Sequence, residues 1–335
     1  MIEHAAGPAP RREHGYCTDD VARALVVVLR EESPSCEVRH LETVYATFLV
    51  RAQLPDGRFH NRLSAAPDCR WLDEGGSDDA TGRALWALGA AAVGRRSPRE
   101  REVALACFER AASFRSTSPR ANATGVLGAA EILRHHPGNA AARMLIERAI
   151  PALGVVAPCV DWPWPEARLA YDNARLPEAR IAAGAALGDP QLLADGLQLL
   201  DWLVEVETRG DVFSFTGQWG WAPGDARPGF DQQPIEAGAM ADACARAYDV
   251  TGDERWVDDC VRAAEWFLGR NDTGVPLVDP ETGGCADGLT PDGRNANEGA
   301  ESTLAMISAF QQARRLQAPA RAARSGAAST VAAPT

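Results

Sequence analysis

The chain of 335 residues contains no lysine, and all 34 of its basic residues are arginine. Schiff-base catalysis and a covalent pyridoxal phosphate linkage both need a lysine amine, and the P-loop nucleotide site needs a lysine beside the phosphates. The absence of lysine therefore excludes each of these sites.

Metal and redox motifs are also missing. The eight cysteines occur singly, without a CxxC pair, and several fall on apolar faces of predicted helices, where buried reduced thiols are typical. All six histidines lie between His4 and His136, and they form no Cys/His cluster with the spacing of a metal site. We expect neither a metal nor a cofactor.

Long apolar runs and basic patches are absent as well. No apolar stretch is long enough to span a bilayer, and the first sixteen residues lack the pattern of a secretory signal. The formal net charge of −12 disfavours nucleic acid or an anionic membrane as a partner. We expect a cytoplasmic protein with a neutral partner, formed by one domain over residues 1–317 and a disordered Ala/Ser/Pro-rich tail over residues 318–335.

The chain does contain a repeated pattern of amphipathic helices. Links within a pair of helices are short, which predicts antiparallel hairpins, and links between pairs are long and rich in Gly, Pro and aromatic residues. Strand-like runs are too short to form a sheet domain. Apolar spacing at i, i+3, i+4 and i+7 predicts helices over residues 18–32, 37–53, 78–94, 98–114, 119–136, 139–153, 172–187, 190–207, 234–250, 253–269 and 297–316.

The two helices of each pair differ in side-chain size. The first is rich in Ala and Gly, as over residues 237–245, and the second carries bulkier apolar residues beside charges, as over residues 192–203. Small side chains suit a crowded inner ring, and mixed faces suit an outer ring. We therefore predict an all-α (α/α)6 toroid of helical hairpins with long loops at one end. Eleven helices are visible, so either the twelfth is irregular or one helix is lacking at the N-terminus.

Carboxylates recur where the inner helices begin, as in "HGYCTDDVARAL" from His14 and "GSDDATGRAL" from Gly76. Capping accounts for single acidic residues, and Asp19 and Asp78 are expected to be caps. It accounts poorly for Glu236 beside Pro234. Parallel inner helices would direct these residues into one concave mouth, a candidate acid/base site. The predicted catalytic residues are Asp79, Asp172, Glu236 and Glu166, followed by Asp20 and Glu298.

The geometry of a six-pair ring predicts which acids face each other. Asp20 would oppose Asp172, and Asp79 would oppose Glu236. A carboxyl separation of roughly 6.5–9.5 Å would indicate an inverting glycosidase, and about 5 Å a retaining one. Arg23, Arg83, Arg175 and Arg180 are expected to neutralise the acidic rim through salt bridges.

The long loops carry aromatic rings and planar amides, which suit sugar rings. For the loop tryptophans, packing against the barrel mouth is an equally good interpretation, whereas Trp86, Trp202, Trp256 and Trp266 lie at helical spacing and are expected in the core. The predicted sugar-binding residues are His60, Asn61, Trp162, Trp164, Asn173, Trp219, Trp221, Gln233 and Asn297.

Four segments resemble those of six-hairpin-glycosidase-like proteins that are associated with glycosyltransferases. They are "HGYCTDDVARAL", "WPWPEARLAYDNARLPEA", "FDQQPIEAGAM" and "NEGAEST", and the resemblance covers nearly the whole chain from about Ile2 to Arg315. It implies an (α/α)6 toroid and carbohydrate chemistry. Toroidal epimerases of similar architecture use histidines on several inner helices, so the histidine distribution here disfavours that activity.

The leading hypothesis is a glycoside hydrolase that acts on a short oligosaccharide through paired carboxylates, without a cofactor or metal. Glycosyl transfer or phosphorolysis on the same scaffold is the alternative within enzymes. A noncatalytic glycan-binding domain that works with a glycosyltransferase is the alternative outside them.

Overall fold

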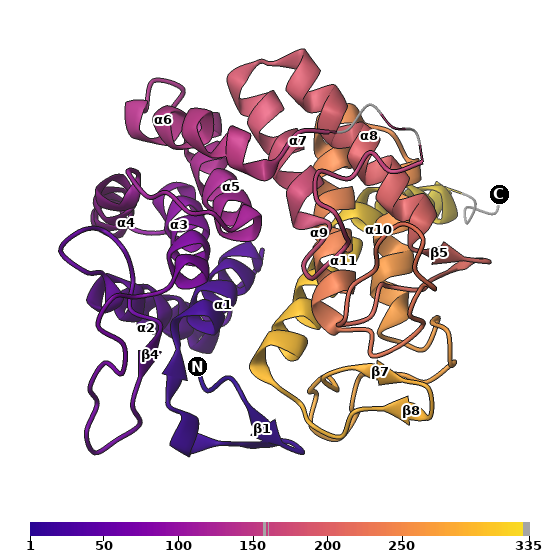
Figure 1. Ribbon diagram of the computed structural model, residues 1–335, viewed down its shortest axis with the longest axis horizontal. Helices are drawn as coiled ribbons and strands as arrows, with labels where there is room; N and C mark the ends of the chain where they lie inside the picture. The colour runs from indigo at the N-terminus through magenta and orange to yellow at the C-terminus, as the bar shows by residue number, and fades with distance from the viewer. Residues whose placement is uncertain (157–158, 160, 331–335) are drawn as a thin grey trace.

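The structure, a computed structural model, describes residues 1–156, 159 and 161–330. These residues contain eleven α-helices, which alternate along the chain between an inner and an outer ring (Figure 1). The inner helices are α1 (Thr18–Arg30), α3 (Asp78–Val93), α5 (Pro119–His135), α7 (Arg175–Leu187), α9 (Pro234–Thr251) and α11 (Ala300–Thr330). The outer helices are α2 (Cys36–Ala52), α4 (Pro98–Ala111), α6 (Ala140–Ala149), α8 (Pro190–Val206) and α10 (Arg255–Trp266).

The inner ring closes on itself. Each inner helix packs against the next one along the chain, and α11 packs against α1. Helices α2, α4, α6 and α8 pack on α1, α3, α5 and α7, while α10 contacts both α9 and α11. Within the described ranges no outer helix covers the junction of α11 with α1. The helix missing from a set of twelve is therefore an outer one, and the six inner helices are all present.

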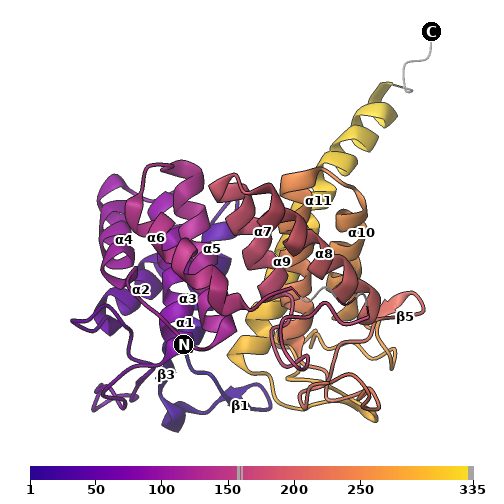
Figure 2. The same cartoon turned by 45° about the horizontal axis from the view of Figure 1, so that its top comes forward.

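Short strands and two 3-10 turns occupy the long links. All four strand pairs are antiparallel and two residues long. Figure 2 shows most of the long links gathered at the lower end of the barrel, while short links join the helices at the other end. The elements are β1 (Ala5–Ala6) with β2 (Ala9–Pro10), β3 (Tyr16–Cys17) with β4 (Arg62–Leu63), β5 (Thr208–Arg209) with β6 (Val212–Phe213), β7 (Leu289–Thr290) with β8 (Gly293–Arg294), and the turns η1 (Arg12–His14) and η2 (Ile150–Leu153).

The eleven predicted helices are all present, and two of them begin three residues later than predicted, α7 at Arg175 and α11 at Ala300. Asp172 and Glu298 consequently lie before their helices rather than inside them. Helix α11 extends away from the barrel as far as Thr330 (Figure 2). The disordered tail predicted over residues 318–335 stays a prediction, and residues 331–335 lie outside the described residues. No helix in the described part of the chain combines the length and hydropathy needed to cross a membrane.

Glycines allow the inner helices to approach closely. A Cβ atom built on Gly89 of α3 would lie 2.2 Å from the carbonyl oxygen of Gly128 in α5, and one built on Gly128 would lie 2.2 Å from the carbonyl oxygen of Leu85. A side chain at either position would overlap backbone atoms of the neighbouring helix. Small residues are therefore required where α3 and α5 touch.

We expect Gly89→Ala to lower the free energy of unfolding by about 1–3 kcal/mol, because the added methyl group forces α3 and α5 apart. Gly138→Ala is the matched control, since a Cβ atom at Gly138 would meet no atom within 4 Å. Urea denaturation of both variants checks the prediction. Equal midpoints for the two variants would contradict it.

The start of α3 is capped by a residue other than the expected one. The side chain of Ser77 accepts a hydrogen bond of 3.0 Å from the backbone N–H of Ala80, and Asp78 accepts one from the hydroxyl of Ser116. The residue preceding α1 makes no side-chain capping bond. The predicted capping roles of Asp19 and Asp78 are therefore wrong, and the Asp19 carboxylate is free for another role.

Candidate active site at the mouth of the inner ring

Three carboxylates at the starts of three inner helices interact electrostatically at the end of the ring that carries the long links. Asp19 of α1 interacts electrostatically with Asp79 of α3 and Glu301 of α11. Arg23 and Arg83, each one helical turn after one of the aspartates, also act on Asp19. We refer to Asp19, Asp79 and Glu301 as the mouth carboxylates.

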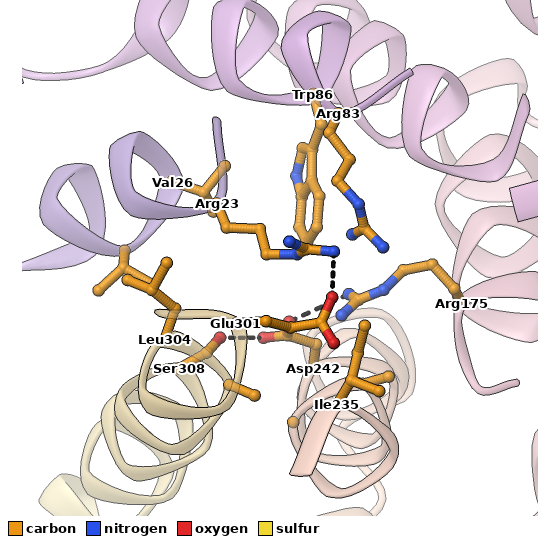
Figure 3. A pocket seen from close by; sticks show the side chains of 14 residues that line it. Arg23, Val26, Arg83, Trp86, Arg175, Ile235, Asp242, Glu301, Leu304 and Ser308 are labelled. Carbon is orange, nitrogen blue, oxygen red and sulfur yellow. Dashed lines mark hydrogen bonds and ion pairs between the residues drawn. The ribbon is translucent and has the colours of Figure 1, made fainter. Parts of the chain in front are cut away.

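A small cavity lies one helical turn further into the ring. Its walls include Arg23, Arg83, Arg175, Trp86 and Glu301, and the three guanidinium groups converge on the space beside Glu301 (Figure 3). The cavity has a volume of about 40 Å³, which is room for about three water molecules. The cavity is therefore too small for a ligand larger than a few water molecules.

Arg23 joins α1 to α11 through two carboxylates. Its guanidinium lies 2.5 Å from Asp20 and 2.5 Å from Glu301. Asp20 is fully buried, and its Oδ2 atom has no hydrogen-bond partner. Burial raises the pKa of Asp20 to about 6, although Arg23 acts in the opposite direction. Asp20 therefore influences the mouth by positioning Arg23.

Asp19 and Asp79 have different surroundings. Burial raises the pKa of Asp19, Arg23 and Arg83 lower it, and the Asp79 and Glu301 charges raise it further. The Oδ1 atom of Asp19 is buried without a hydrogen-bond partner. Both residues are half-buried overall, but the Oδ2 atom of Asp79 accepts the Tyr171 hydroxyl at 3.3 Å. A raised pKa favours the protonated form that a general acid needs, and an accessible carboxylate suits a general base.

Asp172 is held in a strained backbone conformation directly before α7. Its φ angle is +50°, a region that costs a non-glycine residue on the order of 1–3 kcal/mol. Its buried carboxylate lies 3.1 Å from both Arg83 and Arg175. Burial alone would raise the pKa of Asp172, but the two guanidinium groups outweigh burial and hold this pKa below its usual range. Asp172 therefore fixes the two arginines in place.

Glu236, at the start of α9, holds this conformation. Its carboxylate accepts hydrogen bonds from the backbone N–H groups of Asp172 and Asn173, the second at 3.0 Å, and from the Asn173 side chain at 3.2 Å. Burial, followed by the neighbouring Glu207 and Asp172 charges, raises the pKa of Glu236 well above its usual value. Glu236 thus contacts the chain that precedes α7, and its oxygens are occupied by backbone donors.

Glu166 and Glu298 make contacts away from the cavity. Glu166 lies 2.5 Å from Arg120, which also donates to the backbone oxygen of Tyr171 at 2.8 Å. Glu298 accepts the hydroxyl of Thr282 at 2.7 Å. Because α11 begins only at Ala300, the later Glu301 lines the cavity. The structure therefore gives Glu301 the position that the sequence assigned to Glu298.

The predicted aromatic contacts divide into buried and accessible rings. Trp164 is only 2% exposed and stacks on Trp202 at a centroid distance of 5.9 Å. The predicted sugar contact of Trp164 is therefore wrong, because its ring is part of the core. Trp162 packs edge-on against Trp202 and Trp221, each at 5.2 Å. Trp219 is 75% exposed and offers an accessible ring.

Two of the predicted polar residues belong to one loop cluster. The His60 ring stacks on Trp71 at 4.7 Å, and its Nδ1 atom lies 2.9 Å from the backbone oxygen of Asp73. The backbone N–H of Asn61 donates to the Asp73 carboxylate at 3.0 Å. The Asn61 side chain accepts the thiol of Cys17 at 3.7 Å. Both residues support the links that surround the mouth.

The other predicted polar residues lie in three separate places. Asn173 is fully buried, and its Oδ1 atom accepts the backbone N–H of Ala170 at 3.0 Å, so its role is structural. Asn297 accepts the backbone N–H of Gly7 at 3.1 Å and ties the N-terminal strand pair to the start of α11. Gln233 lines a different cavity of about 190 Å³, together with Gln218.

One group of residues has the composition of a weak metal site. Atoms of Glu3, Cys17 and Asp20 lie within 4.8 Å of one another. Arg62 already pairs with Glu3, and Arg23 pairs with Asp20. Two guanidinium charges beside the candidate ligands oppose a divalent cation, so this donor set does not fit a metal centre.

Sequence reasoning placed Arg23 and Arg83 at the acidic rim, but it assigned Asp19 to helix capping and left Glu301 out of the predicted catalytic residues. The signal was present in the spacing, because Asp19 and Arg23 are four residues apart, as are Asp79 and Arg83. Residues four apart lie on the same face of a helix. The same Asp-x-x-x-Arg spacing occurs in two inner helices. It predicts a layer of aspartates at the mouth and a layer of arginines one helical turn deeper.

The raised pKa of Asp20 predicts a pH-dependent stability. Because this pKa rises from 3.8 to about 6 on folding, ionising Asp20 destabilises the folded state. Its contribution is fully present below about pH 4 and is lost as the pH rises through 6, a difference of about 3 kcal/mol. Asp20→Asn should remove this slope. Urea denaturation from pH 4 to pH 7 checks it, and parallel curves for both proteins would contradict it.

Comparisons with known proteins identify solved structures with a similar fold. No protein-family model matches the chain, and no curated protein matches it. Cellobiose 2-epimerase from Spirochaeta thermophila matches with a TM-score of 0.68 and 14% identity, over 95% of this chain and 90% of that chain. D-mannose isomerase matches with a TM-score of 0.68 and 11% identity, over 94% and 92%. The α-mannanase BT2949 of Bacteroides thetaiotaomicron, from glycoside hydrolase family 76, matches with a TM-score of 0.61 and 10% identity, over 92% and 88%.

The similar structures establish the fold of the chain. The chain is an (α/α)6 toroid, as its sequence predicts, and its neighbours include both epimerases and glycosidases.

Proposed function

We propose that the protein is a carbohydrate-active enzyme, and more particularly a glycoside hydrolase for a short neutral oligosaccharide. The observation that carries this proposal is the group of three mouth carboxylates, contributed by α1, α3 and α11 to one end of a closed ring. Glycosidic hydrolysis needs one protonated and one ionised carboxyl group at the same bond. The similar structures named for sugars give the proposal additional support.

Asp19 is the proposed general acid and Asp79 the proposed general base. Burial favours the protonated form of Asp19, and the half-buried Asp79 is oriented by the Tyr171 hydroxyl. In an inverting reaction the nucleophile is a water molecule that lies between the two carboxyl groups. Asp20, Asp172 and Glu236 act as positioning residues, because their oxygens bind arginines or backbone N–H groups.

The charges at the mouth favour a neutral substrate. Arg23 is paired with Asp20 and Glu301, and Arg83 is paired with Asp172. The guanidinium groups therefore have anionic partners within the protein, and an anionic sugar would have to displace them. A neutral sugar can donate hydroxyl hydrogens to the carboxylates without doing so.

The distribution of histidines opposes an epimerase that uses histidines on several inner helices. Within the described residues, α7, α9 and α11 contain no histidine. This observation favours hydrolysis over the epimerisation named for three of the similar structures.

The proposal is tested with a panel of defined neutral oligosaccharides, followed by product chromatography with and without inorganic phosphate. Hydrolysis products formed without phosphate would support it, and the anomer seen first by NMR would report inversion. Products that appear only with phosphate would identify a phosphorylase instead. Binding without any product would identify a noncatalytic glycan-binding domain, for which a glycosyltransferase in the cytoplasm is the proposed partner.

A further inference from the structure

The opposite end of the inner ring contains a much larger cavity. We call it the rear cavity; it has a volume of about 620 Å³ and is bounded by Arg30, Trp86, Glu131, Asp242, Arg246 and Gln312. These residues belong to α1, α3, α5, α9 and α11, and Glu178 adds α7. The closed ring therefore builds this cavity from all six inner helices. Its volume falls in the range of small-molecule sites, whereas the cavity at the mouth holds only water.

Three arginines of the rear cavity are paired with carboxylates, whereas Arg95 at its edge donates to the backbone oxygen of Glu32. Arg246 lies 2.7 Å from Glu131, and Arg30 lies 2.7 Å from Asp242. Arg315 donates two hydrogen bonds, of 2.7 and 3.1 Å, to Asp249. At each of these three pairs an anionic ligand would have to displace a carboxylate from its guanidinium, and a cationic ligand would have to displace a guanidinium. Hydroxyl groups can accept from the guanidinium and donate to the carboxylate of the same pair.

Amide and apolar groups complete the lining. Gln312 donates to Asp242 at 3.0 Å and accepts from Arg315 at 3.1 Å. Gln311 donates to the backbone oxygen of Val27 at 3.0 Å, and its buried Oε1 atom has no hydrogen-bond partner. Trp86 and Val93 supply an apolar wall.

We propose that the rear cavity is a second binding site, which takes a neutral polyhydroxyl ligand such as a mono- or disaccharide. Paired charges, planar amides and an indole in a concave space are the groups that hold a sugar's hydroxyls and C–H faces. The site is separate from the mouth carboxylates and does not depend on the reaction proposed for them.

Asp242 connects the two cavities, because it lines both of them. It lies 2.7 Å from Arg30 on the rear side and 3.0 Å from Arg175 on the other. Arg175 in turn holds Asp172 at 3.1 Å. A ligand that draws Arg30 toward itself changes the partners of Asp242 and, through Arg175, the positioning of the mouth.

Calorimetric titration of the full chain with D-mannose, cellobiose and inorganic phosphate tests the proposal. At least one sugar should bind in the millimolar range, and phosphate should not. Val93→Trp, which fills the cavity, should weaken sugar binding at least tenfold, and Gln311→Leu should weaken it severalfold. Val103→Trp is the matched control, since Val103 is 43% exposed on α4, and circular dichroism shows whether each variant folds.

Three results would overturn the rear site: no binding of either sugar, binding of phosphate alone, or sugar affinity unchanged in both folded rear variants. Asp79→Asn separates this test from the proposed function. Sugar binding that Val93→Trp weakens and Asp79→Asn preserves would support the rear site, even if no oligosaccharide is hydrolysed.

Discussion

Replacing Asp79 by asparagine is expected to lower kcat on the correct oligosaccharide by about 10³-fold, with little change in stability. Asparagine preserves the shape of the side chain and can still accept the Tyr171 hydroxyl, but it cannot take a proton from water. General acid–base catalysis by one side chain contributes typically about 10²–10⁴-fold. Steady-state kinetics with chromatographic detection of the product measures the effect.

Asp78→Asn is the matched control for this experiment. It makes the same change of charge one residue earlier, but Asp78 accepts the hydroxyl of Ser116 and has no place among the mouth carboxylates. We expect its kcat to stay within about threefold of the original protein, since no proton transfer is lost. The assignment fails if Asp79→Asn, correctly folded, retains full turnover or if both variants lose activity equally.

Replacing Arg175 by methionine is expected to lower the free energy of unfolding by about 3–5 kcal/mol. Arg175 is buried and lies 3.1 Å from Asp172, 2.6 Å from Glu178 and 3.0 Å from Asp242. Methionine keeps much of the side-chain volume but leaves these buried carboxylates without their shared cation. Urea denaturation at pH 7 gives the magnitude.

The control for Arg175 is an exposed arginine. Arg255 pairs with Asp201 at 2.5 Å, but the two side chains are 49% and 58% exposed. Exposed pairs contribute about 0–1 kcal/mol, so Arg255→Met should have a small effect. Similar losses in the two variants would show that the arginines inside the ring do not hold the inner helices together.

The helices could be predicted from the sequence because each one follows a local rule. Apolar spacing defines them, and small residues identify the inner ones, as the contact of Gly89 with Gly128 confirms. The prediction placed the starts of α7 and α11 too early because both are set by long-range contacts. Glu236 binds the backbone before α7, and Asn297 is bound to Gly7, 290 residues earlier.

The site was predicted less completely than the fold. Acidic residues at the inner helix starts were expected at one mouth, and Asp79 lies there. Spacing alone could not show which of Glu298 and Glu301 lines the cavity. A shift of three residues in the start of α11 moves Glu298 away from the cavity and brings Glu301 to it. It also could not show that Trp164 is buried against Trp202, because loop aromatics look alike in sequence whether they face solvent or the core.

The sequence by itself determined the (α/α)6 toroid, the end of the barrel that gathers acids, and the absence of lysine-dependent chemistry. These properties depend on periodicity and composition, which are local. The tertiary structure alone decided which acid meets which arginine, and that Asp19 interacts with Asp79 and Glu301 instead of capping α1. Buried charges interact strongly over a few ångströms, because the protein interior has low polarity. The protonation state of each carboxyl group therefore depends on neighbours that ring closure brings from distant parts of the chain.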